Sequence, residues 1–177
     1  MSDNQQILRL NVGFITSQNV GYSRKFTFDH PYIHIAPDLD LYELSGHAIG
    51  TKTAKGILIQ VNLEAVTTLE CSRCLEDYPH SIEIEFTELF AFDPQNIDES
   101  AQRLPEHGGI DLAPLVWEEM LVSIPINPLC SSQCLGLCPI CGGNRNEILC
   151  DHPESSVDPR LEVLRSYLAE EPDSPAD

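Results

Sequence analysis

The sequence predicts an α+β fold, in which an antiparallel β meander carries two short helices and a cysteine-rich segment. Three observations support this prediction. Apolar and polar residues alternate in several runs before residue 88, which is the period of strands with one wet face. Two later runs have helix-start residues followed by apolar residues on one side. The seven cysteines all fall within residues 71–74 and 130–150.

The first strands are expected in the N-terminal third of the chain. Residues 7–15 (ILRLNVGFI) predict a short strand, and residues 23–25 (SRK) predict a polar, basic link. Residues 26–36 alternate imperfectly, and the strand pattern strengthens over residues 41–53. A turn is expected at residues 54–56, where lysine and glycine interrupt the pattern.

The clearest strand follows that turn and runs to the first cysteine pair. Four apolar residues alternate there with other residues: Ile57, Ile59, Val61 and Leu63. Pro79 is expected to break the pattern, and a further strand is predicted over residues 82–87. Cys71 and Cys74 are therefore predicted at a corner between two strands of an antiparallel meander.

Both helices are predicted from their start signals. Residues 93–109 are polar and aperiodic and predict a mobile acidic loop. Asp111 is the expected N-cap of a helix that continues to about Ser123, before two prolines. A second helix with aligned leucines is predicted over residues 159–170, after an Asp-Pro start.

This reading divides the chain into three parts. We expect a β-rich core with one helix, a zinc-knuckle segment whose C-terminal helix packs on that core, and a disordered acidic tail. Their predicted boundaries are 1–129, 130–170 and 171–177.

The chain is strongly acidic, with a formal net charge of −18. Between Leu75 and Leu129 there are 12 acidic residues and one basic residue, Arg103, so that 1 − 12 gives a local net charge of −11. Such a surface repels phosphate and disfavours direct tracking of a nucleic-acid backbone. It favours a basic protein partner, although a solvated surface without a partner has the same composition.

The N-terminus, MSDNQQILRL, lacks the basic start and apolar centre of a signal peptide. The chain has no apolar run of the roughly 18 residues that a membrane helix requires. A cytoplasmic location is therefore expected, with thiols reduced or bound to metal rather than paired in disulfides. The odd number of cysteines agrees with this expectation.

The cysteines are spaced as metal ligands. Residues 138–142 read Cys-Pro-Ile-Cys-Gly, a zinc-knuckle pattern in which glycine lets backbone N–H groups tilt towards sulfur. The chain supplies eight candidate ligands for one or two structural Zn²⁺ ions: Cys71, Cys74, Cys130, Cys134, Cys138, Cys141, Cys150 and His152.

Two pairings of these ligands are open. A sequential pairing joins Cys71/Cys74 to Cys130/Cys134 and leaves Cys138/Cys141 with Cys150/His152. A crossed pairing joins the two Cys-x-x-Cys motifs to each other. Either way the ligands fill every position of the tetrahedron, and no general base stands at helical spacing beside them. The expected sites are therefore structural, and we expect no enzymatic activity.

Several motifs together resemble the bacterial YceD family, the large ribosomal RNA subunit accumulation proteins. They lie at residues 69–75 (LECSRCL), 110–112 (IDL), 124–128 (IPINP), 134–142 (CLGLCPICG) and 157–161 (VDPRL). The resemblance covers about residues 35–170 and is closest to the cysteine-rich cyanobacterial and chloroplast form. The chain departs from that form at His152, where cysteine is equally expected.

The resemblance implies a role in the production or stability of large-subunit ribosomal RNA, with no catalytic residues to transfer. The favoured hypothesis is a non-enzymatic assembly factor whose acidic face binds a basic ribosomal protein or maturation factor. The alternative is a rubredoxin-like iron–thiolate electron carrier. The knuckle at residues 71–75 argues against it, because it lacks the glycine that such sites use to bring N–H groups to sulfur. Direct RNA binding would depend on Arg73 and Arg145, which are few for that purpose.

Overall fold

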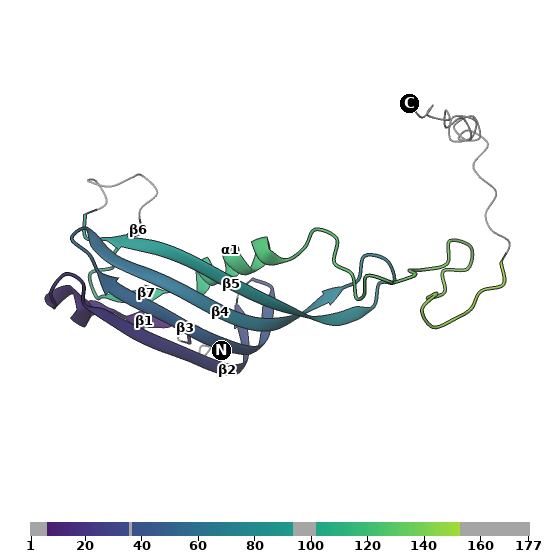
Figure 1. The fold of residues 1–177 in the computed structure, drawn as a ribbon, viewed down its shortest axis with the longest axis horizontal. Coiled ribbons are helices and arrows are strands. Elements are labelled where there is room, and N and C mark those ends of the chain that lie inside the picture. Colours follow the sequence, from purple (N-terminus) through teal and green to yellow (C-terminus); the bar gives the residue numbers. More distant parts are fainter. Residues whose placement is uncertain (1–6, 36, 94–101, 153–177) are drawn as a thin grey trace, which may run out of the picture. The chain divides into compact units, whose positions relative to one another are not determined.

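The computed structural model describes residues 7–35, 37–93 and 102–152. Its larger sheet has the strand order β2-β3-β4-β5-β6 (Figure 1). The bounds are Ser23–Ile35, Leu39–Lys52, Gly56–Glu70, Asp77–Ala91 and Gln102–Arg103. Strands β2 to β5 pair antiparallel, whereas β6 pairs parallel with the end of β5. The predicted antiparallel meander is thus found in four strands, and β6 adds a short parallel edge.

One face of this sheet is covered by smaller elements. Strands β1 (Arg9–Asn11) and β7 (Gly109–Asp111) form a two-stranded antiparallel sheet, followed by the α-helix α1 (Ala113–Ser123). A 3₁₀ helix, η2 (Gly13–Ser17), follows β1. A single buried cluster draws side chains from all these elements, among them Leu10, Ile15, Leu63, Ile84, Ile110 and Met120. Burial of this apolar cluster is the main stabilising term of the fold.

The alternation seen in the sequence decides which face is buried. Ile57, Ile59, Val61 and Leu63 of β4 are all buried, as predicted. The residues between them point to the other face, where Gln60 and Glu64 are exposed. That second face of β2 to β5 carries mostly polar side chains.

The N-terminal predictions need two corrections. The strand expected over residues 7–15 is only three residues long, because its partner β7 is equally short and the chain then turns into η2. That turn depends on a close approach: a Cβ on Gly108 would lie 2.4 Å from the Cα of Gly13. The expected link at residues 23–25 instead opens β2 and pairs with β3, since exposed polar side chains suit the wet face.

Two further corrections concern β5 and the loop after it. Pro79 does not break the pattern but lies within β5, opposite Thr68. β6 pairs only with the far end of β5, so the other side of Pro79 is an edge, where a missing N–H is tolerated. The loop expected over residues 93–109 contains β6 and the first residue of β7, and its residues 94–101 lie outside the described residues.

One of the two predicted helices is found, and so the prediction of two short helices is not met within the described residues. α1 starts two residues after Asp111, whose carboxylate accepts a hydrogen bond from the Ala113 N–H (3.0 Å). The helix ends at Ser123, before the extended Ile124 that Pro125 requires. The second helix, over residues 159–170, and the tail lie outside the described residues.

The chain divides into two compact units, Met1–Cys134 and Leu135–Asp177. The predicted packing of the C-terminal helix on the core stays a prediction, because that helix is not described. None of the helices in the described ranges is long and apolar enough to cross a membrane.

Candidate metal centres

The first cysteine group lies at the corner between β4 and β5. Cys71 and Cys74 form that corner, and Cys130 and Cys134 reach it from the segment after α1. The four sulfurs lie within 4.8 Å of one another. The Cys71–Cys134 sulfurs are 3.8 Å apart and the Cys74–Cys130 sulfurs 3.6 Å apart. A zinc–sulfur bond of about 2.3 Å gives tetrahedral edges of about 3.8 Å, so this group could hold such an ion.

Hydrogen bonds tie the two segments of this group together. The backbone N–H and the hydroxyl of Ser72 both donate to the Pro128 carbonyl, at 2.9 and 3.0 Å. The Arg73 guanidinium donates to the Cys134 carbonyl at 3.0 Å. Tyr78 and Leu129 pack against the buried sulfurs of Cys71, Cys74 and Cys134. The β4–β5 corner and the segment after α1 are therefore held together by hydrogen bonds and by packing.

The backbone also favours the form of sulfur that binds metals. The N–H of Cys130, followed by those of Cys74 and Arg73, donates to Cys71 and lowers the pKa of its thiol to about 6. In the second group the N–H groups of Cys141 and Ile140 lower the pKa of Cys138 to about 7. Thiolates are the metal-ligating form of cysteine, and these backbone N–H groups favour that form at the first cysteine of each knuckle.

The second group lies within the unit Leu135–Asp177. Cys138, Cys141, Cys150 and His152 place their ligand atoms within 4.8 Å of one another, and the Cys141–Cys150 sulfurs are 3.6 Å apart. Cys138 is buried, Cys150 is half-buried, and Cys141 and His152 are exposed. The turn is closed by two backbone bonds of 2.8 Å, from Cys138 N to Gly143 O and from Gly142 N to Cys138 O. This group is more open to solvent than the first, and it too could hold a metal ion.

The two knuckles share one backbone conformation. Gly142 has φ of +73° and follows the second cysteine, as the sequence pattern requires. Leu75 stands at the same place in the other knuckle and has φ of +60°, a left-handed conformation that is rare for leucine. Its N–H bonds to the Cys71 carbonyl at 2.9 Å, as Gly142 does to Cys138. The missing glycine therefore does not alter the first knuckle, a result that the local sequence pattern did not indicate.

All eight predicted residues thus lie in two groups, arranged in the sequential and not the crossed pairing. The two Cys-x-x-Cys motifs fall in different groups. Among the features that the sequence did not indicate are the Arg73 bond and the packing of Tyr78, since both depend on a strand corner meeting a distant segment.

A family model described as "Large ribosomal RNA subunit accumulation protein YceD" matches residues 59–167. All eight grouped residues lie within this match. No solved structure matches the chain.

Three relatives show similar sequence identity to this chain. An uncharacterized protein of Mycobacterium tuberculosis is 31% identical over 133 residues, covering 68% of this chain and 60% of that protein. The uncharacterized protein YlbN of Bacillus subtilis is 32% identical over 123 residues, covering 68% of this chain and 72% of that protein. The protein named large ribosomal RNA subunit accumulation protein YceD of Haemophilus influenzae is 31% identical over 88 residues, 45% of this chain and 48% of its own. The matched region spans about 60% of the mycobacterial relatives' length.

Proposed function

The chain belongs to the YceD family, and on this premise we propose that it is a non-enzymatic, zinc-stabilised factor supporting large-subunit ribosomal RNA. The observation that carries the proposal is the family match over residues 59–167, which includes the β4–β5 hairpin and both cysteine groups. The family is named for accumulation of an RNA rather than for a reaction. We propose a cytoplasmic location, where thiols stay reduced and available to a metal.

Zinc is the metal that we propose for both groups. One group offers four thiolates, and the other offers three thiolates and an imidazole; both are ligand sets of closed structural zinc sites. A bound ion would supply cross-linking, because every tetrahedral position is taken by a side chain and none is left for substrate. In the first group it would join the β4–β5 corner to the segment after α1.

An iron–thiolate electron carrier is the less favoured alternative. A rubredoxin-like site would use the two Cys-x-x-Cys motifs together, whereas these motifs lie in separate groups. Metal analysis of protein purified without chelator separates the two hypotheses. We expect one to two zinc ions per chain and a colourless solution; iron, with its visible thiolate absorption, would overturn the assignment.

The proposed partner is a basic ribosomal protein or maturation factor. Support comes from the net charge of −18 and from the polar face of the larger sheet, which α1 does not cover. Charge complementarity would speed encounter with a cationic protein and discourage RNA from competing for the same surface.

Deletion of the gene tests the function directly. Large-subunit RNA is expected to fall relative to small-subunit RNA and to recover when the intact chain is restored. A native-salt pull-down that reads both RNA and protein would then separate a ribosomal protein from a precursor particle as partner. Unchanged large-subunit RNA after deletion would contradict the proposed function.

A further inference from the structure

We propose that a groove on the exposed face of the larger sheet binds an extended, arginine- or lysine-rich protein segment. This inference rests on the proposed function, because it locates the surface through which the basic partner would act. The groove has a volume of about 760 Å³ and crosses strands β2 to β5. Each of these strands contributes one carboxylate to it: Asp29, Glu43, Glu64 and Glu83.

Strand register places three of these carboxylates in one row. Asp29 pairs with Ser45, Ser45 pairs with Glu64, and Glu64 pairs with Glu83. With strands about 4.8 Å apart, the row is about 14 Å long, the length of roughly four residues of extended chain. An extended segment lying along the row would therefore present successive cationic side chains to Asp29, Glu64 and Glu83.

The acidic row brings like charges together on neighbouring strands. Glu64 and Glu83 face each other directly across neighbouring strands, and like charges in that position destabilise a sheet. The Ser45 hydroxyl donates to the Glu64 carboxylate at 2.9 Å and holds it in the row. No lysine or arginine within the described ranges forms an ion pair with these carboxylates. A cationic ligand would relieve the repulsion between the facing carboxylates of Glu64 and Glu83.

A bulge shapes one end of the groove. The β3–β4 register shifts between Tyr42 and Ser45, and Glu43 in this bulge has φ of +53°. A bulge bends its strand and increases its local twist. The strained backbone at Glu43 therefore belongs to the lining of the groove.

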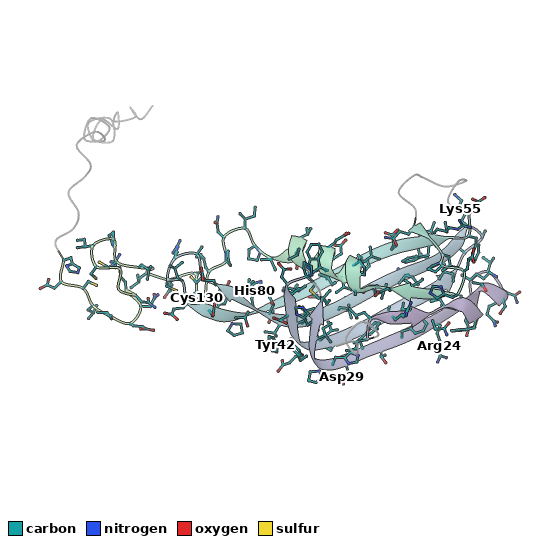
Figure 2. The ribbon with its side chains drawn as sticks, turned by 180° about the vertical axis from the view of Figure 1, so that it is seen from behind. Arg24, Asp29, Tyr42, Lys55, His80 and Cys130 are labelled. Carbon is teal, nitrogen blue, oxygen red and sulfur yellow. The ribbon has the colours of Figure 1, made fainter. Side chains whose placement is uncertain are left out.

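Two exposed tyrosines border this end. Tyr42 pairs with Val66, which lines the groove, and its ring lies 5.4 Å from that of Tyr32 on β2. Figure 2 shows Tyr42 and Asp29 on the same part of the sheet. Tyrosine faces attract guanidinium and ammonium groups, so the rings extend the same preference beyond the carboxylates. Phosphate would instead meet four carboxylates, which is why we favour a cationic protein segment over RNA.

The test uses the full chain and a 12-residue peptide of alternating arginine and serine. The groove variant is Glu64→Gln with Glu83→Gln. The matched control is Glu118→Gln with Glu119→Gln, which removes the same charge from exposed positions on α1. We expect the groove variant to bind the peptide about fivefold or more weakly and the control to change by less than about twofold.

Two further readouts guard against an unfolded variant. The groove variant is expected to melt at the same temperature as wild type or higher, because it loses the Glu64–Glu83 repulsion. Amide NMR shifts on peptide addition are expected at Ser45, Glu64 and Glu83. Equal weakening in both variants would show that net charge alone acts and would overturn the groove assignment. The groove assignment would also be overturned if a 12-nucleotide single-stranded RNA bound this face more strongly than the peptide does.

In cells the same variants separate this inference from the proposed function. If deletion leaves ribosomal RNA unchanged, the proposed function fails, whatever the peptide does. If deletion lowers the RNA but the groove variant binds peptide as wild type and restores the RNA fully, the groove assignment alone fails.

Discussion

Replacement of Cys138 by serine is expected to unfold the cysteine segment and leave the larger sheet intact. The described part of its unit, residues 135–152, buries one apolar side chain, Cys138 itself. Leu135, Ile148 and Leu149 of that segment are 57%, 54% and 98% exposed. The segment therefore has no apolar core there to hold it once a metal ligand is lost.

The size of the effect follows from metal binding and from the bonds at stake. Structural zinc contributes on the order of 10 kcal/mol to the folding of small metal-stapled segments. Loss of about half of that would lower amide protection more than about a thousandfold, since each ~1.4 kcal/mol is a factor of ten. The reporting amides are those of Cys138, Gly142, Arg145 and Ile148, which donate to backbone carbonyls within the segment at 2.8–2.9 Å.

Hydrogen exchange read by mass spectrometry measures this change. We expect Cys138→Ser to lose protection over residues 135–152, while β2 to β5 exchange as in wild type. Leu149→Ser is the control, because that side chain is almost fully exposed. Equal protection of the segment in Cys138→Ser and wild type would refute its dependence on a metal ion.

Four further outcomes are expected. A mild chelator should remove metal from the second group before the first, because Cys141 and His152 are exposed while Cys71, Cys74 and Cys134 are buried; metal release followed in Cys71→Ser and Cys138→Ser backgrounds assigns the order. Leu75→Gly should raise the unfolding free energy by about 1 kcal/mol in thermal or denaturant melts, because it relieves a left-handed leucine; a clear loss would contradict the strain. The association rate with the basic partner should fall steeply as salt is added. It should also fall in the double variant Glu83→Lys with Glu85→Lys, which changes two exposed residues on one face of β5, while the dissociation rate changes little. An association rate that does not depend on salt would count against charge steering. Finally, Cys71→Ser should weaken binding of the arginine–serine peptide and Cys138→Ser should not, as read by the same titration.

Local patterns predicted the strands well where one face is apolar. The period-two run of β4 identified its buried residues because alternation is a property of the strand itself. Predictions from local patterns were wrong at Pro79 and at residues 23–25, where the structure depends on what lies beside the strand. An edge position and a wet face are set by sheet order, which no local pattern contains.

The two groups of candidate ligands could be predicted only in part, for the same reason. Spacing identified all eight candidate residues, since knuckle ligands are close in sequence. The pairing of the groups was open until the β4–β5 corner and the segment after α1 were seen to meet. Leu75 shows the limit most clearly, because its conformation is imposed by the knuckle and opposes the preference of its side chain.

The first cysteine group lies on the same β4–β5 hairpin as Glu64 and Glu83 of the acidic groove, and this links stability to the proposed binding. Glu64 faces Glu83 only in the register that closes at Glu70 and Asp77, next to Cys71. A slip of one residue would turn the side chains of a strand to the opposite face and remove the acidic row. The knuckle closes this hairpin through the bond from Cys71 N to Glu76 O, at 3.0 Å. An ion held at the corner would therefore fix the register on which the groove depends, although it lies outside the groove itself.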